Sequence, residues 1–267
     1  MSIAEQNPAQ IATELLTPTI VTEVFVDRPD AHFWLGLIAS GATVAMPVEY
    51  QAAGVFRANV YIDENRFLPD SARRSDGSEA DGDDNRSVHF VILENQIASS
   101  GLTRLVGTTR LISKRDEADT LPVEQLFPEA FASGAADVNS TEASRFIARY
   151  PNRLTQSNLS LSLIRAMTLH ASRSGSKHVY AVVEDSLSRH FKRIGLPFDQ
   201  LSGLKMIPEY NTKNMAIRFD PKLILHEIAA DTVGKRIMTL FFDKVTTDND
   251  GLGFFDETMI SPLKDAS

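Results

Sequence analysis

The chain of 267 residues contains no cysteine. This absence excludes disulfides, thiolate metal sites and a cysteine acyl-enzyme, and it agrees with a reducing compartment. Long apolar runs are missing too, since no window approaches the about 18 apolar residues of a membrane span. The N-terminal segment MSIAEQNPAQ also lacks the basic region of a signal peptide. We therefore expect no membrane span and a cytoplasmic location.

The sequence also lacks an excess of positive charge. Its net charge of −8 argues against a general nucleic-acid binder, whose affinity comes mostly from basic groups on phosphates. The six histidines lack ligand-like spacing with carboxylates on one helix face, so we expect no metal site and no resident cofactor. Neither a Gly-x-Ser-x-Gly elbow nor a Gly-x-x-x-x-Gly-Lys loop occurs, which excludes the commonest hydrolase and nucleoside-triphosphatase classes.

The composition that remains is that of a globular protein, with 43% hydrophobic residues, 14 glycines and 12 prolines. Apolar periodicity predicts helices and strands in the order helix, three strands, helix, strand, helix, strand. The predicted helices cover residues 47–67, 158–177 and 186–196, and the predicted strands cover 88–95, 104–113, 141–149, 178–184 and 213–220. This order predicts a mixed α/β sheet with helices on its faces.

Less regular segments lie around this pattern. The segment 1–48 is predicted to be an N-terminal extension, with IVTEVFV as a short strand and AHFWLGLIASGATVAM as a buried helix or an apolar loop. Residues 68–87 are polar and charge-dense, which predicts an exposed loop. Residues 49–225 are expected to form one domain. Asp220 and Pro221 are expected to begin a C-terminal helix, and 226–267 to form a helical extension and tail.

Charged residues interrupt several of the apolar segments. In TEASRFIAR, Glu142 and Arg145 are three positions apart, so they point to opposite faces of a strand unless a bulge resets the register. Other such charges are Arg57, Asp81, Asp84 and Arg110. Taken singly, each is more simply interpreted as a surface charge or a salt-bridge partner.

Their order along the chain is more specific. FRANVY resembles the Arg-x-x-x-Phe helix of the acyl-homoserine-lactone synthases, EADGDD their Glu-x-Asp-x-x-Asp loop, and VGTTRL their Gly-x-x-Arg strand. LPVEQLFPEAF is similar to their Leu-x-x-x-Phe-Pro-Glu segment, and EASRF to their Glu-x-Ser-Arg-Phe strand. On these motifs, residues 50–220 resemble that family of GNAT-fold acyltransferases. Related N-acyl amino acid synthases share the Gly-Thr-x-Arg-Leu and Ser-Arg strands.

The resemblance implies a GNAT-like, mostly antiparallel central sheet with helices on both faces. It also implies that the sheet splays at a bulge in the central strand. The opening is a V-shaped cleft in which the pantetheine arm of an acyl thioester pairs with backbone groups. A strand that borders such a cavity could carry both Glu142 and Arg145.

The resemblance also implies roles for single residues. Glu142 would be the catalytic base that takes a proton from the acceptor's ammonium group, because only the neutral amine attacks a thioester. The substrate-binding residues would be Arg57, Tyr61, Phe67, Asp81, Asp84, Arg110, Phe127, Arg145 and Phe146. The three arginines would hold carboxylates, either of the acceptor or of Asp81 and Asp84. Tyr61 stands where the family usually has Phe, and Phe67 where it usually has Trp.

The expected acyl donor is a carrier protein. Coenzyme-A-dependent GNAT enzymes usually follow this strand with a glycine-rich turn whose amides bind the pyrophosphate, but RYPNRLTQSNLSLSL contains no glycine. The segment SLSRHFKRIG concentrates Arg189, Lys192 and Arg193 in an acidic chain. These residues would dock an acidic acyl carrier protein, and the alternative is a solvated helix face.

The sequence therefore predicts an enzyme that moves a fatty acyl group from an acyl-phosphopantetheine thioester to the α-amine of a small molecule. The first hypothesis is acyl-homoserine-lactone synthesis from S-adenosylmethionine, for quorum sensing. One alternative is an N-acyl amino acid synthase. Another is a non-catalytic protein that binds acyl thioesters or acyl amides.

Overall fold

The computed structural model describes residues 19–24, 31–39, 48–96 and 103–229. Within these residues nine strands form one sheet in the order β1-β2-β3-β4-β5-β6-β9-β7, and β8 pairs with β9. The strands are β1 (Thr19–Val24), β2 (Ala31–Ala39), β3 (Ser87–Gln96), β4 (Thr103–Ser113), β5 (Thr141–Ala148), β6 (Val179–Glu184), β7 (Asp199–Gln200), β8 (Lys205–Ile207) and β9 (Thr212–Phe219). The pair β5–β6 is parallel and the other pairs are antiparallel, so the predicted mixed, mostly antiparallel sheet is confirmed.

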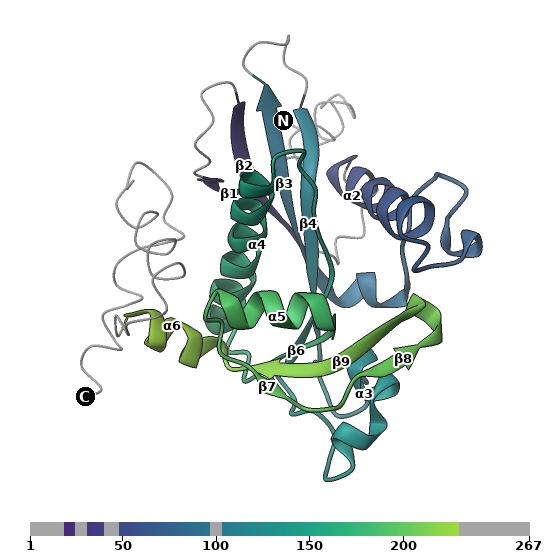
Figure 1. Cartoon of the computed structure of the whole chain (residues 1–267), viewed down its shortest axis with the longest axis vertical. Helices are drawn as coiled ribbons and strands as arrows, with labels where there is room; N and C mark the ends of the chain where they lie inside the picture. The colour runs from purple at the N-terminus through teal and green to yellow at the C-terminus, as the bar shows by residue number, and fades with distance from the viewer. Residues whose placement is uncertain (1–18, 25–30, 40–47, 97–102, 230–267) are drawn as a thin grey trace, which may run out of the picture.

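Helices lie on both faces of this sheet (Figure 1). They are α2 (Val48–Ala58), which continues as the π-helix η2 (Asn59–Glu64), then α3 (Pro122–Leu126), α4 (Arg153–Arg173), α5 (Asp185–Arg193) and α6 (Pro221–Ala229). Short 3-10 helices are η3 (Asp70–Ala72), η4 (Gly82–Arg86), η5 (Pro128–Phe131) and η6 (Pro208–Tyr210).

Alternation along the strands assigns the helices to their faces. Phe90 and Ile92 of β3 belong to the main core with Leu163 of α4, whereas Val91 between them packs with Ala53 of α2. Because successive strand residues face opposite sides, α2 and α4 cover opposite faces of the sheet. Figure 1 shows these two helices on either side of β3 and β4.

The N-terminal strands correct one prediction. Ala31–Ala39 forms β2, which pairs with β1 and β3, so the prediction of a buried helix or an apolar loop was wrong. An unbroken apolar run has no period that distinguishes a helix from a strand. Here the run forms a strand because it pairs with the edge of β3. The predicted short strand is present as β1. Both strands lie in the predicted 1–48 extension and join the same sheet.

Two glycines follow directly on the ends of helices. Gly175 follows α4 with φ of 75°, and Gly195 follows α5 with φ of 76°, a conformation that favours glycine after a helix. The short elements α3, β7 and β8 were not predicted. No helix in the described ranges is long and apolar enough to cross a membrane.

Candidate active site

Strand β5 contains the bulge that the family resemblance implied. Arg110 of β4 pairs with Ser144, but Thr108 pairs with Ile147, so two steps along β4 match three along β5. The extra position is at Arg145, whose φ of 55° lies in the left-handed region. The register after the bulge is therefore shifted by one residue. Side chains that would lie on opposite faces of a regular strand can then share a face.

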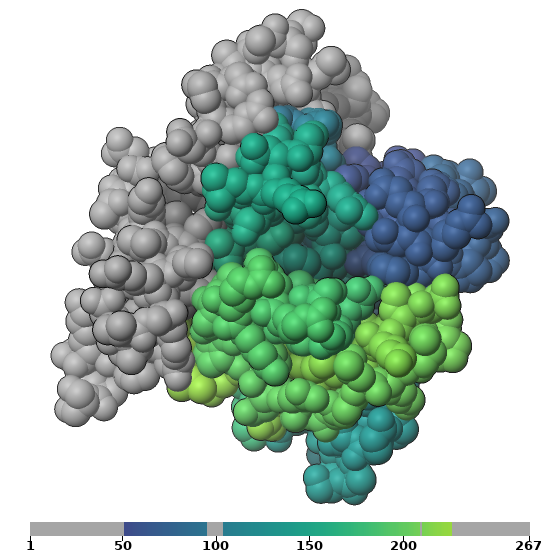
Figure 2. Space-filling model, viewed as in Figure 1, coloured from purple at the N-terminus to yellow at the C-terminus, as the bar shows by residue number. Residues whose placement is uncertain are grey.

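Next to the bulge, β5 parts from β6. The two strands pair only between Thr141–Ala143 and Val179–Ala181, and a cavity of about 730 Å³ lies where the pairing ends. Residues of η2, β5, α4, β6, α5 and β9 line it, and both Glu142 and Arg145 are among them. In Figure 2 the segments that carry α2, α4 and α5 meet on one face of the molecule. The predicted V-shaped cleft is present.

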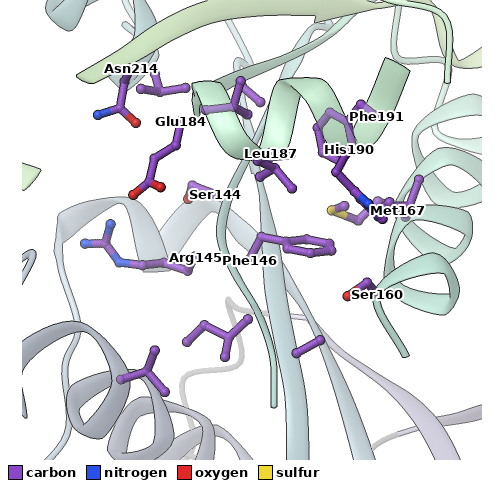
Figure 3. Close-up of a pocket in the computed structure, with 18 of the residues that line it drawn as sticks. Ser144, Arg145, Phe146, Ser160, Met167, Glu184, Leu187, His190, Phe191 and Asn214 are labelled. Atoms are coloured by element: carbon purple, nitrogen blue, oxygen red, sulfur yellow. The ribbon is translucent and has the colours of Figure 1, made fainter. Parts of the chain in front are cut away.

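The cavity has a polar and an apolar end (Figure 3). The labelled side chains on the polar side are Ser144, Arg145, Glu184 and Asn214. Those on the other side are mostly apolar: Phe146, Leu187, Phe191 and Met167, with His190 and Ser160. An apolar wall next to a few polar groups suits a ligand that combines a fatty chain with a polar head.

Arg57 of α2 begins an ion network beside the polar end. Its guanidinium donates to both carboxylate oxygens of Asp84, at 3.0 and 2.9 Å, and its Nε lies 2.8 Å from Glu79 Oε2. The loop that carries Glu79 packs directly on α2, because the Glu79 amide donates to the Gly54 carbonyl at 2.9 Å. A side chain at Gly54 would place its Cβ 2.8 Å from the Cβ of Ser78, so glycine permits this approach.

Arg110 and Arg145 close the network. Arg110 donates to both oxygens of Asp81, at 2.6 and 2.8 Å, and to Asp84 at 2.7 Å. Arg145 donates to Glu79 at 2.8 Å and to Asp81 at 3.1 Å. The predicted residues Arg57, Asp81, Asp84, Arg110 and Arg145 thus come together. Of the two roles predicted for the arginines, the structure shows the binding of the protein's own carboxylates.

Three guanidinium groups and three carboxylates balance in this network. Burial alone would raise the pKa of Asp84, but the hydrogen bond and charge of Arg57, with the charge of Arg110, hold it well below its usual range. Burial also raises the pKa of Asp81, but the hydrogen bond and charge of Arg110 outweigh it, so the pKa of Asp81 is lowered. Asp84 is 2% exposed, whereas the Asp81 side chain is 34% exposed. Only the Asp81 side of the network faces outward.

Glu79 belongs to this network but was not predicted as a site residue. It is the first residue of the Glu-x-Asp-x-x-Asp motif, two positions before Asp81. Its place as the first acidic residue of that motif was therefore the signal that could have identified Glu79.

Glu142 lies in a different environment. It is 2% exposed, it lines the cavity, and its Oε2 accepts a hydrogen bond from the Val123 amide at 2.8 Å. No ion pair to Glu142 occurs in the part of the chain that the structure describes. Burial raises its pKa to about 8, against the Val123 bond and the charge of Arg110. A buried carboxyl without a cation keeps its proton until alkaline pH.

The predicted aromatic residues divide between cavity and core. Tyr61, Phe67 and Phe146 line the cavity, and the Tyr61 ring lies 5.5 Å from the Arg145 guanidinium. Burial raises the pKa of Tyr61 to about 12, so its hydroxyl stays protonated. Phe127 is fully buried in the core around α3 and is not among the cavity-lining residues. The structure therefore does not bring Phe127 to the predicted substrate site.

The predicted docking residues lie on α5. Arg189, Lys192 and Arg193 are exposed, and Arg189 forms an ion pair with Asp185 one turn earlier. His190 and Phe191 of the same helix line the cavity. The basic surface is thus carried by an element that also forms the cavity wall.

The start of α4 differs from a pyrophosphate-binding turn. Asn152 caps the helix, and its Oδ1 accepts hydrogen bonds from the Leu154 and Thr155 amides at 2.9 and 3.1 Å. These amides are therefore satisfied by the protein itself. In the described residues no group of three or more His, Asp or Glu side chains could hold a metal ion.

Comparison with known proteins agrees with this geometry. Residues 56–161 match the acetyltransferase (GNAT) domain. An acyl-homoserine-lactone synthase of Aeromonas salmonicida is 27% identical over 171 residues, which cover 61% of this chain and 76% of the relative. The resemblance inferred from the motifs is confirmed.

Solved structures share the fold at lower identity. BjaI, a coenzyme-A-dependent acyl-homoserine lactone synthase, is 18% identical with a TM-score of 0.54, covering 80% of this chain and 90% of its own. FeeM, an N-acyl amino acid synthase from uncultured soil microbes, is 15% identical with the same TM-score, covering 78% of this chain and 98% of its own. At these identities the likeness concerns the fold alone.

Proposed function

We propose that this chain, a GNAT-fold acyltransferase related to acyl-homoserine-lactone synthases, acylates the α-amine of S-adenosylmethionine and releases an acyl-homoserine lactone. The observation that carries the proposal is the cavity at the β5–β6 splay, which joins an apolar wall to a carboxyl without a cation, Glu142. A cavity of this kind can hold an acyl thioester and an amine in contact.

Glu142 would act as the general base in its ionised form, whose share grows as the pH approaches its pKa of about 8. The α-ammonium group must lose a proton before its nitrogen can attack the thioester carbon. An α-ammonium group has a pKa of about 8, and the pKa of the Glu142 carboxyl is also about 8. Transfer between groups of matched pKa costs little free energy. The attack then forms the amide bond and expels the thiol of the donor.

Lactone formation follows without another protein group. The carboxylate of the acylated S-adenosylmethionine attacks its own γ-carbon and displaces the sulfonium as a neutral thioether. The positive charge on sulfur is lost and the carboxylate charge is consumed, so the step balances. The product is an acyl-homoserine lactone.

We further propose that the acyl donor is an acyl carrier protein. The amides at the start of α4 are used by Asn152, and α5 presents exposed basic residues beside the cavity. A carrier protein brings its acyl-phosphopantetheine arm without a free nucleotide pyrophosphate. Because BjaI, with the same fold, depends on coenzyme A, both donors belong in the test.

The test combines each donor, acyl carrier protein or coenzyme A, with S-adenosylmethionine or with free amino acids, and identifies products by mass spectrometry. We expect the lactone from the carrier-protein donor with S-adenosylmethionine. A linear amide with an amino acid would instead favour an N-acyl amino acid synthase. Binding without turnover of any pair would contradict the proposal.

A further inference from the structure

Glu184, the last residue of β6, is the second carboxylate on the cavity wall. Among the described residues, the only hydrogen bond or ion pair of its side chain comes from the Ser186 hydroxyl at 3.3 Å. It stands at the N-cap of α5, yet its side chain makes no capping bond. Figure 3 shows it among the polar side chains with Ser144, Arg145 and Asn214. Its side chain is thus free to interact with a ligand.

The charges around Glu184 are already compensated. Arg145 is paired with Glu79 and Asp81, and the six-residue network beside the cavity carries equal numbers of positive and negative groups. Glu142 is a carboxyl and carries no positive charge in either protonation state. None of these groups supplies a cation to Glu184.

The other cations on the cavity wall do not supply one either. Arg149 pairs with Glu64 at 3.1 Å, and Arg153, in the first turn of α4, forms no ion pair with Glu184 in the described residues. The Glu184 carboxylate also lies at the N-terminus of α5, where the helix dipole favours a negative charge. Among the described residues no cationic side chain pairs with it, so beyond the partial positive charge of the α5 N-terminus its negative charge is uncompensated.

A filled cavity makes such a charge costly. When acyl donor and acceptor displace water, a carboxylate needs a cation or hydrogen-bond donors in place of its hydration. The reacting α-ammonium cannot supply the cation throughout, since it must become neutral to attack. The remaining source is a second positive charge on the acceptor.

We infer that Glu184 selects acceptors that carry a positive charge in addition to the α-ammonium group. A sulfonium, as in S-adenosylmethionine, and a side-chain ammonium, as in lysine, both have this chemistry. The inference rests on the proposed function for the place of the acceptor, and it adds the residue that determines which amines are accepted. Glu184 acts here on specificity, whereas Glu142 acts on the proton.

The test measures binding by calorimetry without any acyl donor. Two matched pairs isolate the charge: S-adenosylmethionine against S-adenosylhomocysteine, which lacks the sulfonium, and lysine against norleucine, which lacks the side-chain ammonium. We expect the wild type to prefer the charged member of one pair by roughly tenfold, as for a partly solvated charge pair. The pair that shows the preference identifies the source of the charge.

Glu184→Gln should abolish this preference by weakening the charged ligand and leaving its neutral partner unchanged. The matched control is Asp185→Asn, which removes a neighbouring charge that pairs with Arg189 instead of lining the cavity. That control should keep the preference. An equal loss for charged and neutral ligands, a preference retained in Glu184→Gln, or no preference in the wild type would each overturn the inference.

The two proposals can fail separately. If no donor and amine give an acylated product but the preference and its loss are observed, the proposed function fails while the inference about the cation stands. If the lactone forms equally well in Glu184→Gln, with an unchanged ratio of kcat/KM values for charged and neutral acceptors, the function stands and the inference fails.

Discussion

Asp84 and Glu142 are both 2% exposed, but the protein treats their charges in opposite ways. Asp84 receives hydrogen bonds from two guanidinium groups, which lower its pKa, whereas Glu142 receives one from a backbone amide, and burial raises its pKa to about 8. A compensated charge stabilises the fold and has little left to offer a substrate. An uncompensated carboxyl costs stability when it ionises, and for that reason it can exchange a proton with a substrate.

Removing the reactive carboxyl should give the largest effect. Glu142→Gln keeps an oxygen that can accept the Val123 amide, so the fold should remain, while kcat/KM should fall by roughly 10²–10⁴-fold, as for loss of a positioned base. Steady-state kinetics with circular dichroism on the same sample checks both statements. Near wild-type turnover at neutral pH would show that another group takes the proton.

Removing the compensated carboxylate should instead affect stability. Asp84→Asn removes the buried carboxylate that Arg57 and Arg110 share and leaves one more positive than negative charge in the network, so the free energy of unfolding should fall by about 3–5 kcal/mol. Urea denaturation measures this loss. The control is Asp63→Asn, which removes an exposed partner of Arg73 and should cost less than about 1 kcal/mol. Equal losses in the two variants would contradict a structural role for the network.

The outer side of the network should show an intermediate effect. Asp81→Asn should lower the free energy of unfolding by roughly 1–3 kcal/mol, because a third of its side chain is exposed and water replaces part of the lost bonding. Because Asp81 holds Arg145, which lines the cavity, the KM for the acceptor should also rise while that for the donor stays unchanged. Kinetics with each substrate varied in turn would show this difference, and unchanged acceptor kinetics would assign Asp81 to the scaffold alone.

The basic residues of α5, which lie outside the network, should change only the rate of association with the donor. Reversing Lys192 and Arg193 to Glu should lower kcat/KM with acyl carrier protein by roughly tenfold at low salt, because complementary charge mainly raises association rates and is screened over ~8 Å at physiological ionic strength. A small acyl-pantetheine donor should be used as before, which controls for misfolding. If no donor is affected, α5 presents a solvated face and the choice of carrier protein is wrong.

Much of this arrangement is local in the sequence and could be predicted. Periodicity identified α4 and the strands β3, β4 and β5, and the family resemblance implied the bulge beside Glu142 and Arg145. The ordered motifs brought Arg57, Asp84 and Arg110 together although they are far apart in the chain.

The rest depends on contacts that no short segment contains. The apolar run of β2 becomes a strand because β3 offers it an edge, and Phe127 is drawn into the core around α3. Glu184 reads in the sequence as an ordinary strand end. Only the divergence of β5 from β6 makes it part of a cavity wall.

The contrast between the two carboxylates is tested most directly by the free energy of unfolding of the wild type and Glu142→Gln as a function of pH. The pKa of Glu142 rises from about 4.5 in the unfolded chain to about 8 in the folded one, so the folded state holds the proton more tightly. Its contribution is fully present below the lower pKa and is lost as pH rises toward the upper one. Between these values the wild type should lose about 1.4 kcal/mol per pH unit relative to Glu142→Gln, and the difference should level off above pH 8. A difference that stays constant from pH 4 to pH 9 would contradict a cation-free, proton-exchanging Glu142.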